Sequence, residues 1–337
     1  MVLIHVWEEI SYFDCFGAAP TGFWHNLLQF GAGPLAAPLF MFAMGVGICY
    51  SSHRTPKDFA KRGVQLFVMG YLLNFFRNGI YFAIYYWTRG EWDIPELIYQ
   101  SFCGDIFHFA GLTFLLVALF KKYKMSVLTM GGVAIVMQIV GRLLSQYVPV
   151  DEGLTYIVGH FYYVGNCYFP LLQWFIFPVA GIIFAKYLRY ITDKDKFYRS
   201  VLGISALLLL GFCSALYFAE YDIRNFYILK DDIYYQQEFF HSAFTILVIL
   251  IELALLYFVT QKIHSSAINR TLEYISSNLN HIYIIQWMLV GTATFVVMMA
   301  DIDDLQAGPA ILLGFAFIVL SVLISKLYDR IKSRILK

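Results

Sequence analysis

Charge is scarce in this chain, and that shortage decides its class. Only 14% of the 337 residues are charged and 60% are hydrophobic, whereas a soluble domain carries about 25% charged residues. A soluble protein is therefore excluded. The net charge of +1 gives no electrostatic reason to expect nucleic acid as a partner, because a nucleic-acid-binding surface needs an excess of Lys and Arg.

Cysteine patterns and polar linkers are missing as well. The five cysteines form no CxxC pair and no zinc-ligand spacing, so we expect neither a metal site nor a redox motif. Cys15, Cys103 and Cys167 fall toward one predicted face, where one disulfide stays an open alternative. The chain lacks low-complexity segments, long linkers and a soluble domain, so we expect a single transmembrane domain over residues 1–337.

Long apolar runs fill most of the chain. Most have about the 20 residues that a helix rising about 1.5 Å per residue needs to cross a hydrocarbon core of about 30 Å. They predict an all-α integral membrane protein, a bundle of about ten transmembrane helices. The runs cover residues 34–52, 63–88, 104–120, 125–148, 168–190, 200–219, 238–261, 274–300 and 308–326, with a shorter one at 1–13.

The first run is too short for a complete span. As a helix, residues 1–13 reach about 20 Å, so we expect a first span truncated at its start, or a short helix held by its neighbours. A cleaved signal peptide fits poorly, because no basic segment precedes the apolar stretch and Glu8 and Glu9 follow at once.

Loop charges alternate from one connection to the next. Lys and Arg accumulate in cytoplasmic loops, so the basic segments place residues 53–62 and 191–199, together with both termini, in the cytoplasm. The acidic loops, among them residues 149–167, are expected on the opposite face. A bacterial inner membrane is the expected location.

Ionisable residues inside the runs are the candidates for chemistry, because each costs roughly 2.5 to 3.5 kcal/mol on insertion scales. His5 lies in the first run, with Glu8 and Glu9 about one turn later. A histidine can take a proton from a hydroxyl or amine near neutral pH, and a carboxylate can orient it. The alternative for His5 is a structural hydrogen bond to a backbone carbonyl. Arg77, deeper in its run, is expected to pair with a carboxylate.

Asp105 and His108 form a second candidate pair. They are three residues apart, on one face of a helix near its predicted outer end, as an acid–base pair requires. Gly104 and Asp105 also open that helix, however, and a carboxylate suits a helix start. Capping is the favoured interpretation for Asp105, and the two interpretations stay open for His108.

Several short blocks, read in order over residues 1–290, resemble the multi-span acyltransferases typified by heparan-alpha-glucosaminide N-acetyltransferase and its bacterial relatives. The sequence departs from that family by lacking the Asp-x-x-Arg-Gly element that opens the first span, and by having Gln286 where a histidine often stands. The matching blocks are Met1-Val-Leu-Ile-His5, Pro38-Leu-Phe-Met-Phe-Ala-Met-Gly45, Lys61-Arg62-Gly63 to Asn74, Gly104-Asp-Ile-Phe-His108 with Gly111-Leu112, Phe169-Pro-Leu-Leu-Gln-Trp174 with Gly181, and Ser276 to Trp287.

The resemblance implies acyl transfer across a membrane. Acetyl-CoA would bind on the cytoplasmic side, and a sugar or glycan acceptor would be modified near the other face. His5 would be the catalytic base or acyl carrier, assisted by His25, His108 and Asp105. Basic residues suited to the phosphates of CoA are Arg54, Lys61, Arg62, Lys121 and Lys122.

Two other functions are compatible with the same sequence. A transporter or flippase would bind a small polar or lipid-linked substrate at mid-membrane without making a bond, and matching broken helices in both halves would favour it. A catalytically inactive family member would bind lipid or a protein partner. Membrane lipid is an expected partner in each case, and a homodimer is a further expectation.

Overall fold

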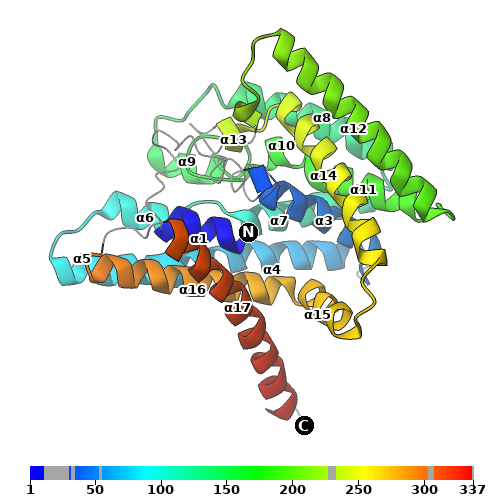
Figure 1. Ribbon diagram of the computed structural model, residues 1–337. Helices are drawn as coiled ribbons and strands as arrows, with labels where there is room; N and C mark the ends of the chain where they lie inside the picture. The colour runs from blue at the N-terminus through cyan, green and yellow to red at the C-terminus, as the bar shows by residue number, and fades with distance from the viewer. Residues whose placement is uncertain (11–29, 32–34, 53–54, 227–232, 303–306, 336–337) are drawn as a thin grey trace. The chain divides into compact units, whose positions relative to one another are not determined.

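The computed structural model describes residues 1–10, 30–31, 35–52, 55–226, 233–302 and 307–335. In these residues every regular element is a helix, and the one β-type pairing is an isolated bridge between Gly104 and Cys167 (Figure 1). The all-α prediction is confirmed. The chain divides into two compact units, and each is described by itself.

The first unit comprises residues 1–25, 73–101 and 259–337. The helix α1 packs on α16 and α17, while α5 and the π-helical turn η1 pack on α16. The buried face of α1 packs into this core and consists of Ile4, Val6, Trp7 and Ile10. The elements are α1 (Val2–Ile10), η1 (Phe75–Gly79), α5 (Ile80–Arg89), α6 (Ile94–Phe102), α15 (Ser266–Ser277), α16 (Leu279–Met299) and α17 (Ala307–Ile335).

The second unit comprises residues 26–72 and 102–258. Its most extensive helix pair is α3 with α11, and α8 packs on α10 and α11. Gly45 of α3 and Gly181 of α11 each face the partner's backbone directly, the close crossing that small residues allow between membrane helices. The elements are α3 (Ala36–Tyr50), most of α4 (Pro56–Asn74), α7 (Ile106–Lys122), α8 (Val127–Leu144), α9 (Glu152–Val158), α10 (Leu171–Trp174), α11 (Ile176–Leu188), α12 (Lys194–Phe218), η2 (Ile223–Phe226), α13 (Ile233–Gln236) and α14 (Phe239–Gln261).

The expected number of about ten spans is not supported. Six segments within the described residues are long and apolar enough to cross a membrane, and α3 is a shorter apolar helix of 15 residues. The first run forms only the nine residues of α1, and the run at 63–88 is divided by η1 between α4 and α5. The six segments are 127–144, 171–188, 194–218, 239–261, 279–299 and 308–335.

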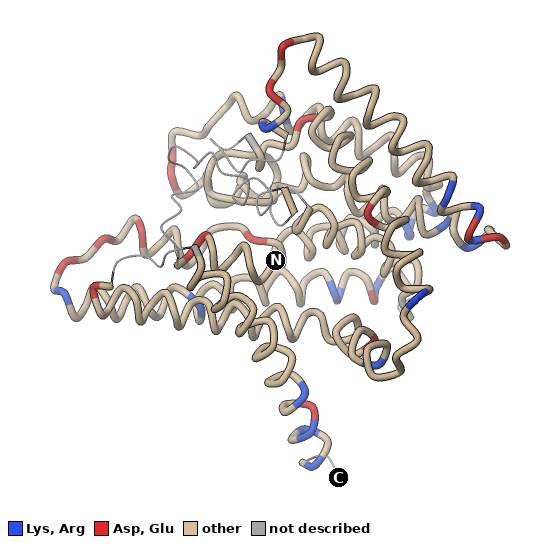
Figure 2. The backbone as a smooth tube through the Cα atoms, viewed as in Figure 1, with Lys and Arg blue, Asp and Glu red and all other residues tan. Residues whose placement is uncertain are grey.

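Charges separate to opposite ends of single helices. In α12 the first turns carry Lys194, Lys196 and Arg199, whereas Glu220 and Asp222 follow its other end (Figure 2). Along α17 the basic residues gather toward the C-terminal end, at Lys326–Arg334. Each helix is therefore polarised in the sense that the positive-inside rule predicts. The assignment of these ends to cytoplasm and exterior stays a prediction.

Several polar side chains in the apolar helices of the second unit form hydrogen bonds or ion pairs. The Gln138 amide nitrogen donates to the carbonyl oxygens of Gln173 and Gln237, at 3.2 and 2.8 Å, and to the Ser242 hydroxyl at 2.6 Å. Arg142 near the end of α8 forms a salt bridge of 2.7 Å with Glu238. These contacts satisfy groups that would otherwise be costly in a membrane.

Candidate functional site

His5 is held by two residues of α16. Its ring stacks on Trp287, with centroids 4.1 Å apart and planes inclined by 24°. The side-chain amide of Gln286 lies against His5 Nδ1, with the amide oxygen at 3.2 Å and the amide nitrogen at 3.0 Å. Gln286 and Trp287 are themselves buried. The short helix α1 therefore presents one histidine to a fixed pair of neighbours that follow it by 281 residues.

The Gln286 contact leaves two tautomers of His5 open. An amide can turn either its oxygen or its nitrogen toward a histidine, and the choice follows from the hydrogen-bond network. With the amide oxygen accepting from Nδ1–H, the lone pair of the imidazole is on Nε2, which is the form that a general base requires. Sequence reasoning expected a carboxylate to orient His5, whereas the orienting contact that the structure places on Nδ1 is an amide.

Trp287 also carries a buried cation. The Arg77 guanidinium lies 3.8 Å from the centre of the Trp287 ring, and the arginine is only 3% exposed. A desolvated cation–π contact of this kind is worth about 2 kcal/mol. Gly291, one turn after Trp287, contacts the Arg77 backbone so closely that a side chain there would collide with it. Arg77 lies in the π-helical turn η1, a type of distortion that occurs frequently at functional sites.

Asp105 and His108 are brought together, as a helix cap. Asp105 Oδ1 accepts from the Ile106 N–H at 2.6 Å, and the Asp105 N–H donates to His108 Nδ1 at 3.0 Å. The two residues form a capping box at the start of α7. The capping interpretation of Asp105 therefore agrees with the structure. His108 is fully buried, and one ring nitrogen is used by the cap.

His160, which sequence analysis did not single out, lies beside this cap. Its ring centroid is 5.1 Å from that of His108, and its Nε2 is 2.7 Å from the hydroxyl of Tyr71. Burial lowers the pKa of His160 to about 4, so the ring is neutral at pH 7. His160 lies within a stretch rich in Tyr and Phe, a composition that is typical of a membrane-interface belt, and the stretch carries no spacing signal that singles this histidine out.

The remaining catalytic and cofactor-binding candidates are distributed as follows. His5 belongs to the first unit, whereas Asp105 and His108 belong to the second. His25 and Arg54 lie outside the described residues. Roles in catalysis for His25, Asp105 and His108 stay predictions.

The predicted phosphate-binding residues gather where α4 begins and α7 ends. Lys121 Nζ lies 4.5 Å from the centre of the Phe59 ring, which is one turn before Arg62 on α4. Lys61 and Lys122 are exposed, and Arg62 is half-buried. We call these residues, together with two from the end of α11, the basic cluster. Its members are Lys61, Arg62, Lys121, Lys122, Lys186 and Arg189.

Lys186 and Arg189, at the end of α11, are not among the phosphate-binding residues predicted from the sequence. The structure places both, with Lys121, within electrostatic range of Cys49 at the end of α3. Arg189 donates to the Cys49 carbonyl oxygen and lies 4.6 Å from the Tyr50 ring. Three helices of the second unit, α4, α7 and α11, thus contribute to one basic cluster beside the end of α3, a grouping that loop charge alone does not reveal.

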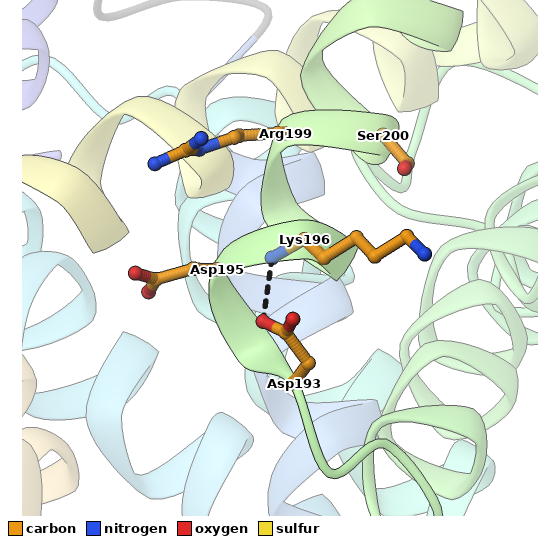
Figure 3. A pocket seen from close by; sticks show the side chains of 5 residues that line it. All are labelled: Asp193, Asp195, Lys196, Arg199 and Ser200. Atoms are coloured by element: carbon orange, nitrogen blue, oxygen red, sulfur yellow. Dashed lines mark hydrogen bonds between the residues drawn. The ribbon is translucent and has the colours of Figure 1, made fainter.

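A pocket of about 600 Å³ lies at the start of α12, lined by Asp193, Asp195, Lys196, Arg199 and Ser200. Figure 3 shows Asp195 and Arg199 on one side of the helix, and Lys196 and Ser200 on the other. Asp193 accepts from the Lys196 N–H at 2.9 Å, and Asp195 accepts from the Tyr257 hydroxyl at 2.7 Å. The donors diverge and two carboxylates accompany them, so this pocket is a poor phosphate site.

Comparison with known protein families identifies the class. A family model described as an acyltransferase domain matches residues 1–329, and the chain belongs to this family. With its apolar helices, the protein is a membrane acyltransferase. Comparisons with curated proteins and with solved structures give no significant match.

Proposed function

We propose that the protein transfers an acetyl group from cytoplasmic acetyl-CoA to a sugar or glycan acceptor at the opposite membrane face, with His5 as catalytic residue. The observation that carries the proposal is the placement of His5: an ionisable side chain on an apolar helix, oriented by Gln286 and stacked on Trp287. Membership of the acyltransferase family supports the reaction class. The short sequence blocks that resemble heparan-alpha-glucosaminide N-acetyltransferase support the donor and the acceptor.

In the direct route, His5 acts as a general base. Nε2 takes the proton of an acceptor hydroxyl or amine while that atom attacks the thioester carbonyl carbon. The carbon–sulfur bond then breaks, and the imidazolium returns its proton to the departing CoA thiolate. The products are the acetylated acceptor and CoA.

In the covalent route, Nε2 itself attacks the thioester, and CoA leaves before the acceptor binds. The acceptor hydroxyl or amine then attacks the acetyl carbon, the carbon–nitrogen bond to His5 breaks, and neutral His5 is regenerated. The proton of the acceptor passes to water, and the departed CoA thiolate takes one up from water. Both routes need the same Nδ1–H tautomer, so the Gln286 contact serves either one.

Trp287 offers a second catalytic group. Its indole N–H is buried and has no hydrogen-bond acceptor among the described residues. A donor held in this way suits the negative charge that develops on the acyl oxygen during attack, which is the task of an oxyanion-hole donor. Arg77, which lies against the face of the same ring, keeps the indole in place.

On the donor side, the basic cluster of α4, α7 and α11 is the proposed site for the phosphates of CoA. Arginine and lysine side chains bind phosphate through charge-assisted hydrogen bonds. The cluster combines exposed Lys61 and Lys122 with half-buried Arg62, so a ligand from solvent can reach it. The addition of Lys186 and Arg189 enlarges the set proposed from sequence.

The test is acetyl transfer by the full chain in nanodiscs, with radiolabelled acetyl-CoA and a panel of glycan acceptors. His5→Ala should lower the rate by about 10² to 10⁴, the usual contribution of a general base. The matched control is His281→Ala, which changes an exposed histidine of α16. Equal activity of His5→Ala and the control would refute the role of His5, and CoA release without acceptor labelling would refute the acceptor class.

A further inference from the structure

The connection between α5 and α6 turns back on itself within four residues. Helix α5 ends at Arg89, and Gly90 adopts a left-handed conformation with φ of 73°, its N–H donating to the Tyr86 carbonyl at 2.9 Å. A glycine adopts that conformation without steric cost. Asp93 then caps the start of α6 by accepting from the Glu96 N–H at 3.0 Å. The reversal brings Trp92 beside Tyr86, with ring centroids 6.5 Å apart and planes inclined by 41°.

This turn encloses an open cleft of about 750 Å³, which we call the α5–α6 cleft. Its volume is within the range of small-molecule sites, about 300 to 1,000 Å³. The rings of Tyr85, Tyr86 and Trp92 line it, together with the charged groups of Arg89, Glu91 and Asp93. Trp92 is 54% exposed, a large aromatic surface left uncovered by the rest of its own unit.

Arg89 is held in place before any ligand arrives. Its guanidinium forms an ion pair with Asp301, just beyond the end of α16, and lies 5.5 Å from the centre of the Tyr85 ring. A planar guanidinium fixed in this way offers N–H donors in a set geometry. Glu91, on the turn itself, is exposed and supplies carboxylate acceptors. The cleft therefore presents aromatic faces with donors and acceptors at their edges.

We propose that the α5–α6 cleft binds a pyranose ring of the glycan acceptor. A pyranose has one apolar face of C–H groups, which packs on an aromatic ring, and a rim of hydroxyls that donate and accept hydrogen bonds. The proposal rests on the proposed function, because the cleft lies on the face where the acceptor is expected, at the acidic turn of residues 89–93.

A phospholipid headgroup fits the same cleft less well. A membrane-interface belt also gathers Tyr and Trp, but a belt needs no enclosed volume and no carboxylates. Here Glu91 and Asp93 line the cleft beside Arg89, and both would repel a phosphate. A neutral polyhydroxylated ring meets no such repulsion and uses the carboxylates as acceptors.

The experiment measures saccharide binding by saturation-transfer NMR on the full chain in nanodiscs. One arm uses the soluble probes cellobiose and N,N'-diacetylchitobiose, and the other uses nanodiscs that contain a glucosyl diacylglycerol, compared with plain phospholipid. Trp92→Ala and Glu91→Gln should weaken binding by about tenfold or more, since they remove the stacking face and an acceptor. Trp87→Ala is the matched control, because Trp87 lies on α5 and is 75% exposed but does not line the cleft.

Absence of saccharide binding in both arms would overturn the proposal, and so would equal effects of Trp92→Ala and Trp87→Ala. Acetyl transfer, measured on the same samples, separates this outcome from failure of the proposed function. If transfer proceeds equally in all three variants, the cleft is wrong and the function stands. If binding depends on Trp92 but no acetyl group is transferred, the function is wrong and the cleft stands.

Discussion

Replacing Gln286 tests whether the amide orients His5 for catalysis. The hydrogen bond to Nδ1 is a neutral contact in the resting state, worth about 1 kcal/mol, and a charged one once His5 carries a proton, worth about 1.5 to 3 kcal/mol. Only the difference, about 0.5 to 2 kcal/mol, accelerates the chemical step. At about 1.4 kcal/mol per decade of rate, Gln286→Leu should lower kcat by about 2- to 30-fold.

Gln286→Glu is the matched variant, because it keeps an acceptor oxygen at the same reach and replaces the amide N–H donor by a carboxylate oxygen, which carries a negative charge. If the amide oxygen is the group that accepts from Nδ1–H, kcat of this variant should fall by no more than about threefold. The assay is the initial rate of acetyl transfer in nanodiscs, with KM for acetyl-CoA measured in parallel and thermal unfolding as the check of folding. KM should change little, since neither variant alters the basic cluster.

Two results would refute this reasoning. Wild-type kcat in Gln286→Leu would mean that the contact with His5 has no part in the rate-limiting chemistry. A loss in Gln286→Glu equal to that in Gln286→Leu, with both proteins folded, would mean that the amide acts as a donor to Nδ1 and that the tautomer assigned to His5 is wrong.

Three further predictions concern other parts of the chain. Burial lowers the pKa of His160 to about 4. Between pH 6.5 and 4, His160 is therefore protonated in the unfolded chain but neutral in the folded one. The free energy of unfolding should fall by up to about 3 kcal/mol over this range. His160→Gln should flatten that dependence in detergent thermal-unfolding curves, and an unchanged slope would contradict it. Arg62→Ala should weaken CoA binding, measured by calorimetry, by about tenfold, whereas Arg199→Ala should leave it unchanged. Equal CoA affinities of the two variants would mean that Arg62 only sets the orientation of the protein in the membrane. Cysteine labelling should place residues 149–167 and 191–199 on opposite membrane faces, and labelling from one side alone would contradict the topology.

Local sequence signals predicted local structure. The capping interpretation of Asp105 rested on its place, after Gly104, at the start of a predicted helix, and in the structure Asp105 caps α7 in a capping box with His108. The apolar runs likewise predicted the all-α class. The count of about ten spans is not supported, because hydropathy does not register where a helix is interrupted or ends early: α1 has nine residues, and η1 divides the run at 63–88.

Contacts between distant segments could not be predicted from the sequence. Arg77 was expected to meet a carboxylate, because charge pairing is the common solution for a buried cation. The structure places the Arg77 guanidinium against the face of Trp287, more than 200 residues later, a contact that the sequence did not indicate, and the carboxylate pairing stays a prediction. His160 was missed for a related reason, since an aromatic stretch near a predicted interface has the composition of a belt whether or not one of its residues turns inward.

His5 and Arg77 both contact Trp287, and the two contacts have different roles. Placing Arg77 in an apolar helix costs roughly 2.5 to 3.5 kcal/mol, and a desolvated cation–π contact returns about 2 kcal/mol of this. Arg77 is thus nearly offset by Trp287 alone, so its presence is consistent with holding the indole in place. His5 forms a hydrogen bond with Gln286, worth about 1 kcal/mol, and its ring stacks on Trp287. These two contacts together fix the orientation of the imidazole, which is the property that a general base needs.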